Sequence, residues 1–421
     1  MCSGVADIIT LVDFVRENRA LATVRGGGHL VTGGSVCENG LVIDLSAMTG
    51  VRVDPDEQIA HVEPGATVGE LFRETQEFGL ATPAGGATDT GVAGSTLGGG
   101  IGYIRRKHGL GIDALRSVTI VTADGQLRTA SEEQNADLFW AIRGGGASFG
   151  VVTSFEFDLY PVGPEVMVAY TFYPIEQGAD TLRSFREFTA DAPEEATAMI
   201  FHTVVPPAPV FPEERHGDPA FVVIGVYTGP VEAGKEVLAP LQELDNPIVD
   251  LSEPMSFIAL HELQDDIFPA GRKYDWRALF ADELSDDLIE RFLEWGSEGS
   301  PLSSIGVWHL DGAMGRVASD ETAFPWRDSS FMISIEAAWE DSDPETAQET
   351  TAWARQARKD LVKVDASQDS LYVGWANADK TGEELSRAAY GENYDRLVEI
   401  KNKYDPAGLF RLDQHLDLTN G

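Results

Sequence analysis

The chain has 421 residues, 43% of them hydrophobic, and its 69 acidic residues against 31 basic ones give a formal net charge of −38. This length and composition suffice for two folded domains, each with its own core, and they exclude an intrinsically disordered chain. The acidic excess leaves no basic patch to neutralise phosphates, so no nucleic-acid partner is predicted.

The acidic residues are spread along the chain rather than gathered in one tail, as at 283–287 and 341–345. Such a surface repels itself unless salt screens it, as in halophilic proteins, so we expect a haloarchaeal origin. The chain starts without a basic signal segment, and no apolar run approaches the ~18 residues of a spanning helix. A cytoplasmic location without a membrane partner is therefore predicted. Two cysteines and eight scattered histidines lack metal-ligand spacing, so no metal site is predicted.

Short helical and strand-like segments fill the first 162 residues. Apolar positions at helical spacing predict a helix over 5–18, and Thr67 is placed to cap a second helix over 68–78. Strand-like runs lie at 21–24, 41–44, 51–53, 59–62, 118–122 and 127–130, the last two joined by a turn at 123–125. This order predicts an α+β domain.

The second part of the chain predicts another α+β domain, a sheet with helices on one face. Its strand-like runs are 166–172, 221–227, 304–309 and 331–337, and its predicted helices are 179–190, 286–295 and 344–359. Near the end, a helix over 394–403 stops before Pro406 because proline cannot continue it.

Three glycine clusters, at 25–34, 91–102 and 143–150, stand between the strands of the first domain. Glycine allows positive φ and close approach of its N–H to an anion, so the clusters predict a nucleotide ligand. A Rossmann motif is excluded because Tyr103 and Phe149 occupy the positions that need a third glycine. No P-loop string is present either.

Four ordered motifs, at 25–29, 42–46, 90–102 and 137–146, resemble those of FAD-linked oxidases of the vanillyl-alcohol oxidase superfamily, which carry a PCMH-type FAD-binding domain. Residues 390–397, with Lys401, 404–406 and Phe410, resemble the berberine-bridge signature of one branch. The resemblance implies an FAD domain of two α+β subdomains over 1–162, shorter than usual at its N-terminus. It further implies an inserted substrate domain with an antiparallel sheet over 163–370, and a C-terminal segment over 371–421 that returns to the flavin.

The resemblance implies FAD contacts from the glycine motifs and from the berberine-bridge signature. They are Arg25, Gly26, Gly27, Gly28, His29, Gly33, Gly34, Pro83, Gly85, Thr90, Gly91, Gly94, Ser95, Leu97, Gly98, Gly99, Gly100, Gly102, Gly150, Val152 and Asn393. In the family, the histidine corresponding to His29 is bonded to the flavin 8α-methyl group; the alternative is a histidine that only packs the loop. Since loop 83–91 has no cysteine, a single covalent link is predicted.

The implied reaction is hydride transfer from an alcohol, a sugar or a related small-molecule donor to flavin N5, with O2 as the acceptor of the electrons. A base must take the donor's acidic proton. The candidates are Tyr390 and Tyr372, although either could be a packing residue. Trp308, His309 and Trp375 are further aromatic candidates; like Tyr372 they lie on strand-like runs that the resemblance places facing the flavin ring. Two alternatives stay open: a dehydrogenase that uses an electron carrier, and a flavin-binding homologue inactivated by its short N-terminus.

Overall fold

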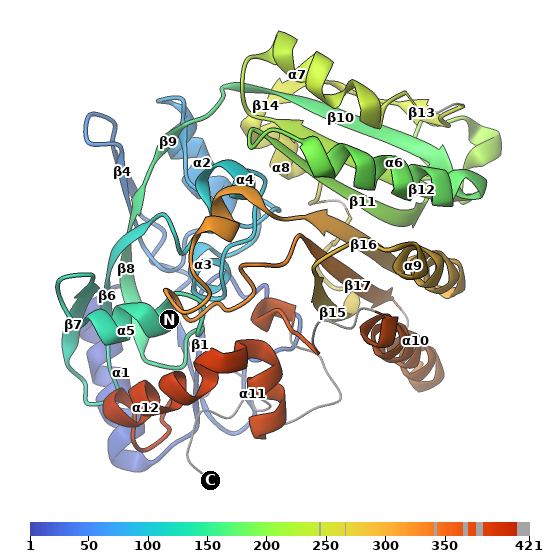
Figure 1. The fold of residues 1–421 in the computed structure, drawn as a ribbon. Helices are drawn as coiled ribbons and strands as arrows, with labels where there is room; N and C mark the ends of the chain where they lie inside the picture. Colours follow the sequence, from blue (N-terminus) through green and yellow to red (C-terminus); the bar gives the residue numbers. More distant parts are fainter. Residues whose placement is uncertain (244–245, 266, 341–342, 365–368, 376–381, 411–421) are drawn as a thin grey trace.

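A computed structural model describes residues 1–243, 246–265, 267–340, 343–364, 369–375 and 382–410. Two sheets of different size organise these residues (Figure 1). The smaller is antiparallel, in the order β3 (Val51–Asp54), β4 (Ile59–Val62), β8 (Val151–Asp158), β6 (Leu115–Val121), β7 (Leu127–Ser131). Beside it lie a parallel pair, β1 (Ala22–Arg25) with β2 (Leu41–Asp44), and a short antiparallel pair, β5 (Leu80–Ala81) with β9 (Tyr160–Pro161).

Five helices accompany the smaller sheet within the described part of the chain: α1 (Val5–Asn18), α2 (Val68–Gln76), α3 (Val92–Leu97), α4 (Arg105–His108) and α5 (Ala136–Ile142). The predicted N-cap is confirmed, since the Thr67 side chain accepts the Glu70 N–H while the Glu70 carboxylate accepts the Thr67 N–H. The helix ends at Gln76, two residues before the predicted Phe78, because Gly79 adopts a left-handed conformation there.

The larger sheet is antiparallel throughout. Its order is β13 (Val249–Asp250), β10 (Glu165–Pro174), β12 (Pro219–Tyr227), β11 (Ala196–Val204), β16 (Ser304–His309), β17 (Phe331–Trp339), β15 (Lys273–Ala281), and β14 (Glu253–Ser256) also pairs with β10. Helices α6 (Gly178–Asp191), α7 (Val231–Leu238), α9 (Asp286–Glu298) and α10 (Pro344–Val364) cover one face, as Figure 1 shows. The predicted α+β class, with helices on an antiparallel sheet, is confirmed.

The other face of the larger sheet packs against the first half of the chain. Along β10, Met167 and Ala169 belong to the core under the helices, whereas Val166 and Val168 belong to the core shared with the smaller sheet. Alternate residues of β10 therefore pack into two different cores. Since both faces of the strand are buried, its sequence is almost continuously apolar. Short helix α8 (Phe257–Glu262) lies at this shared core.

The end of the chain forms α11 (Gly382–Tyr390) and α12 (Tyr394–Tyr404). The short 3-10 turns are Ile175–Gln177, Glu213–Arg215, Ala239–Leu241, Gly312–Arg316, Val373–Trp375 and Gly391–Asn393. Residues 373–375 were predicted to be strand-like, and the 3-10 turn corrects that prediction. Of the helices that the structure describes, none combines the length and the apolar character needed to cross a membrane.

Candidate functional site

A large cavity lies between the glycine loops and the inner face of the larger sheet. The space between them, including the part open to solvent, is about 1770 Å³. Residues 22–35, 85–101 and 146–152 contribute one side, and residues between 264 and 375 contribute the other. The cavity therefore joins the glycine loops to the larger sheet.

The first glycine cluster offers free backbone donors to this cavity. The backbone N–H groups of Gly26, Gly27, Gly28 and His29 have no hydrogen-bond partner among the described residues, and all four residues line the cavity. A Cβ on Gly27 would lie 2.5 Å from the Gly91 Cα, so both positions must be glycine for the first two clusters to touch. A Cβ on Gly94 would meet nothing within 4 Å, because that residue faces open space. These loops fit a group with an anionic centre such as the pyrophosphate of FAD.

The third glycine cluster has a different use. The N–H groups of Gly144 and Gly146 both donate to the Leu97 carbonyl, and a Cβ on Gly144 would lie 2.5 Å from the Phe324 backbone nitrogen. Its glycines therefore allow close packing of loops, and only Gly146 and Gly150 reach the cavity wall. The expectation that every cluster approaches an anion is corrected for this one.

His29 lies at the cavity wall with one ring nitrogen already engaged. Its Nε2 is 3.2 Å from Oδ1 of Asp89, on the loop that precedes α3. A carboxylate at this nitrogen favours the tautomer that carries the proton on Nε2 and leaves the lone pair on Nδ1. The geometry thus presents Nδ1 of His29 as the nucleophilic nitrogen.

Most of the predicted site residues gather around the cavity. Those in its lining are Gly26, Gly27, Gly28, His29, Gly34, Gly85, Thr90, Gly91, Gly94, Ser95, Leu97, Gly98, Gly150, Val152 and Tyr372. Those outside the lining are Arg25, Gly33, Pro83, Gly99, Gly100, Gly102, Tyr390 and Asn393. Gly102 is needed for packing, since a Cβ there would lie 1.9 Å from the Ala84 carbonyl oxygen. Asn393 instead donates to the carbonyls of Ser319 and Thr322, at 2.7 and 3.1 Å.

The two predicted tyrosines differ in their surroundings. Tyr390 is fully buried away from the cavity, where its hydroxyl donates to the Gly145 carbonyl at 3.3 Å. Tyr372 lines the cavity, and its oxygen accepts the N–H groups of Gly100 and Ile101. Burial outweighs these hydrogen bonds and raises the pKa of Tyr372 to about 12. Its phenol is therefore protonated at neutral pH and is a donor rather than a base.

Glu336 is a site residue that sequence reasoning missed. It lies on β17 between Trp276 of β15 and Ser304 of β16, is almost wholly buried, and lines the cavity. Burial raises its pKa to about 7, although a hydrogen bond from the Ser334 hydroxyl opposes the shift. Its Oε2 has no partner in the described part of the chain. The available signal was a lone glutamate within the apolar run 331–339.

Five aromatic residues line the same cavity as Glu336 and form what we call the aromatic wall: Phe268, Trp276, Trp308, Tyr372 and Trp375. The rings contact one another at centroid distances of 4.7 Å for Phe268 with Trp276, 5.5 Å for Trp276 with Trp375 and 5.8 Å for Trp308 with Trp375. The Trp308 indole N–H donates to Ser334 Oγ at 3.1 Å. This bond orients the Ser334 hydroxyl, which donates to the Glu336 carboxylate. Of the further aromatic candidates, His309 does not line the cavity.

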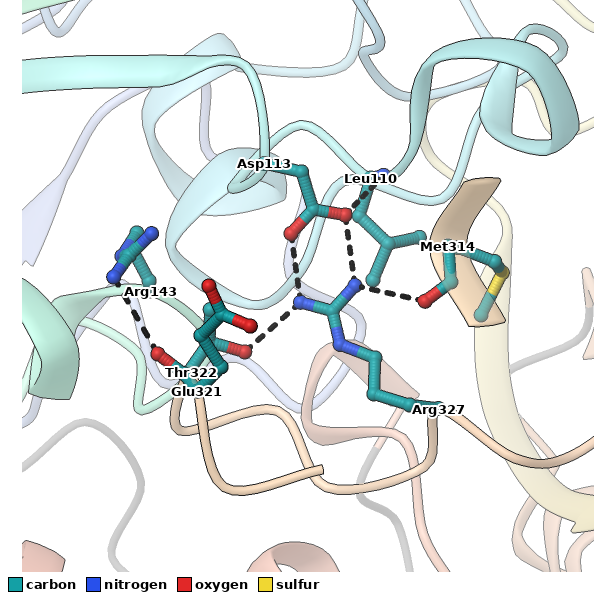
Figure 2. A network of polar contacts seen from close by, with 7 residues as sticks. All are labelled: Leu110, Asp113, Arg143, Met314, Glu321, Thr322 and Arg327. Carbon is teal, nitrogen blue, oxygen red and sulfur yellow. Dashed lines mark hydrogen bonds and ion pairs between the residues drawn. The ribbon is translucent and has the colours of Figure 1, made fainter. Parts of the chain in front are cut away.

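A buried ion pair ties the loop between β16 and β17 to the first half of the chain (Figure 2). Arg327 donates to both carboxylate oxygens of Asp113 at 2.7 Å and to Thr322 Oγ1 at 2.9 Å. The same loop places Phe324 against Gly99 and Gly144. We call the Arg327–Asp113 ion pair, together with this Phe324 contact, the loop clasp; it joins the β16–β17 loop to the glycine loops.

The C-terminal segment is fixed by a second buried pair. Lys401 donates to Asp405 Oδ2 at 2.6 Å and to the carbonyls of Ser148 and Phe410. Asp405 in turn accepts the N–H groups of Leu409 and Phe410. Phe410 then forms a parallel bridge with Ala22, and both residues line the cavity. Residues from both ends of the chain therefore complete one end of the site.

Comparison with known proteins accounts for this arrangement. Residues 1–131 match the family model described as FAD binding domain, and residues 371–416 match the model described as berberine and berberine like. The FAD-linked oxidoreductase YgaK of Bacillus subtilis is 31% identical over 427 residues, which cover 99% of this chain and 90% of that protein. The chain belongs to the berberine-bridge-like FAD-linked oxidoreductases. The predicted family and the predicted cofactor, FAD, are thereby confirmed.

Solved structures share the fold of this oxidoreductase. 6-Hydroxy-D-nicotine oxidase from Arthrobacter nicotinovorans superimposes with a TM-score of 0.86 at 24% identity, over 99% of this chain and 91% of that one. A xylooligosaccharide oxidase from Myceliophthora thermophila in complex with xylobiose gives 0.84 at 24% identity, over 100% and 91%. One fold thus carries oxidases named for 6-hydroxy-D-nicotine and for a xylooligosaccharide.

Proposed function

We propose that this FAD-linked oxidoreductase is an oxidase that removes a hydride from a small-molecule donor, at a carbon bearing a hydroxyl or related group, and passes the electrons to O2. The observation that carries the proposal is one cavity with free amides at its glycine loop and, on its opposite wall, a buried carboxylate whose Oε2 has no partner among the described residues. We further propose that residues 1–162 and 371–421 hold FAD and that residues 163–370 hold the donor.

FAD, when bound, supplies the two-electron acceptor for the hydride. The free amides of 26–29 suit its pyrophosphate, and the aromatic wall excludes water from the reacting carbon. We assign the role of base to Glu336, which takes the donor's acidic proton, in place of the predicted Tyr390 and Tyr372. A carboxylate with a pKa of about 7 is half ionised at neutral pH, whereas the Tyr372 phenol, with a pKa of about 12, is protonated.

The hydride acceptor is tested by mixing the purified protein with candidate alcohols and sugars without oxygen. Bleaching of the yellow flavin followed by hydrogen peroxide on re-aeration supports an oxidase. Bleaching without peroxide supports the dehydrogenase that uses a carrier. If the protein binds FAD but none of the tested donors bleaches the flavin, the result supports the inactive homologue.

We propose that FAD is bonded covalently through Nδ1 of His29, supported by the position of this ring in the cavity wall and by Asp89 at its Nε2. After acid precipitation of the purified protein, we expect the yellow colour to stay in the pellet. His29→Ala should release all of it to the supernatant, and Asp89→Asn should slow the attachment because the tautomer is no longer fixed. His61→Ala, on β4 outside this cavity, is the control and should keep its colour. Colour released from the unaltered protein contradicts the covalent link.

We also propose that the protein is adapted to high salt, from its net charge of −38. Raising KCl from 0.1 M to 1 M shortens the Debye length from about 10 Å to about 3 Å and screens the repulsion between exposed carboxylates. We expect the thermal unfolding midpoint to rise by several degrees over this range and to change little beyond it. A midpoint that stays level or falls between 0.1 M and 1 M contradicts the adaptation.

A further inference from the structure

Asp265 connects the second half of the chain to the loop that carries Asp89, residues 83–91, which we call the Asp89 loop. It lies just after α8, and its carboxylate accepts the Thr88 N–H at 2.9 Å and the Thr88 hydroxyl at 2.5 Å. Hydrogen bonds to an ionised acceptor are roughly twice as strong as those between neutral groups. Asp265 therefore holds Thr88, the residue next to Asp89, by two strong bonds.

The neighbours of Asp89 are fixed from another side as well. The carbonyls of Thr88 and Thr90 accept the two backbone N–H groups of residues 68–69 at the start of α2, both at 2.9 Å. Asp89 itself makes no backbone hydrogen bond within the described chain. Its position against Nε2 of His29 is thus set by the residues that flank it.

Asp265 has a rigid support. Its backbone N–H donates at 3.1 Å within the turn that ends α8. Helix α8 packs on α2 through Phe257 and His261, whose ring centroids lie 5.0 and 4.5 Å from that of Phe72. The two helices pack on each other and hold the Asp89 loop from two sides, α2 through its first N–H groups and α8 through Asp265.

We propose that Asp265 is a positioning residue for the attachment of FAD, because its hold on Thr88 keeps Asp89 against Nε2 of His29. The inference rests on the covalent link of the proposed function and adds to it a residue from the second half of the chain. In the attachment, Nδ1 of His29 bonds to the 8α-methyl carbon, which loses one hydrogen, and the Nε2 proton passes to Asp89. The C–H and N–H bonds that break release two protons and two electrons, and O2 takes them up as hydrogen peroxide.

The rate of attachment tests this role. Full-length protein produced without riboflavin is mixed with saturating FAD in air, and the acid-stable flavin is measured over time. Asp265→Ala removes both bonds to Thr88, so we expect the rate constant to fall about tenfold or more. Asp265→Asn keeps an acceptor for the Thr88 N–H and offers a donor to its hydroxyl oxygen, so it should recover most of the rate. The covalent fraction of the flavin in protein purified directly from cells should follow the same order.

Two comparisons separate positioning from a general effect on the structure. If Asp265 acts through Asp89, the double variant Asp265→Ala/Asp89→Asn should attach FAD at a rate within about twofold of Asp89→Asn alone. In a His29→Ala background, where FAD binds reversibly, Asp265→Ala should change the FAD dissociation constant by less than about threefold. Glu262→Ala removes an exposed acid from the last turn of α8, and as the control it should attach FAD at the unaltered rate.

Three results overturn the role of Asp265. They are attachment by Asp265→Ala within about twofold of the unaltered rate, additive effects of the Asp265 and Asp89 variants, and a loss of FAD affinity as large as the loss of rate. Normal attachment by Asp265→Ala leaves the covalent link standing and removes only this role. An unaltered protein without acid-stable flavin contradicts the covalent link itself, and the inference with it.

Discussion

Glu336→Gln should lower kcat/KM by about 10² to 10⁴ while leaving FAD bound, because it removes the base and keeps its shape. In the unaltered enzyme, kcat/KM should rise with pH and level off above about pH 7, where the Glu336 carboxylate becomes ionised. His29 and Tyr372 are the other titratable side chains in the described cavity wall. Activity of Glu336→Gln within threefold of the unaltered enzyme rejects Glu336 as the base.

The same substitution should raise stability, opposite to its effect on turnover. Burial raises the Glu336 pKa from 4.5 to about 7, so between these pH values the folded protein holds a proton that the unfolded chain has lost. Stability therefore falls as pH increases through this window, by an amount on the order of 3 kcal/mol. Glu336→Gln removes that loss, and its thermal midpoint should exceed that of the unaltered protein at pH 8 and match it near pH 4.5. Glu340→Gln, at an exposed residue paired with Arg272 outside the cavity, is the control and should leave the thermal midpoint unchanged at both pH values.

Arg327→Met should destabilise the protein by about 3–5 kcal/mol, because it leaves the buried Asp113 carboxylate without its counter-charge. Asp113 would retain only the Leu110 N–H, at 2.8 Å. Asp113→Asn should cost a similar amount, and the double variant should cost less than the sum of the two. The measurement is the guanidinium midpoint of the FAD-loaded protein. Exposure of the flavin to solvent at lower denaturant, read from its fluorescence, is also expected, since the loop clasp positions Phe324 against the glycine loops.

Arg316→Met is the matched control for the loop clasp. Arg316 lies in the same connection between β16 and β17 and pairs with Glu194, but both side chains are largely exposed. An exposed pair contributes at most about 1 kcal/mol, so the midpoint should move little. Equal effects of Arg316→Met and Arg327→Met would show that the buried pair has no special role.

The class of fold could be predicted because local patterns agree with the final structure. Helix α1 begins and ends where the apolar spacing predicted, and Thr67 caps α2 as expected. Residues 373–375 were interpreted wrongly because a short apolar and aromatic run looks the same in a strand and in a 3-10 turn. The pairing order of the larger sheet depends on contacts between distant segments, which a single sequence does not reveal.

The cofactor side of the site was easier to predict than the donor side. Glycine loops are contiguous in sequence, so fifteen residues of the prediction fall in the cavity lining, counting Tyr372. Glu336, Trp276 and Trp308 come from three strands that only the folded sheet brings together. Gly100, Gly102 and Asn393 lie outside the lining because a motif records packing requirements as well as ligand contacts.

The Lys401 pair has a consequence for how the protein is made. Phe410 lies in the cavity wall beside Ala22, and its carbonyl accepts a hydrogen bond from Lys401 of α12. During synthesis, residues 22–35 therefore leave the ribosome long before the segment that closes their site. We therefore expect a chain that ends before Lys401 to lack this wall of the site and to hold FAD less tightly.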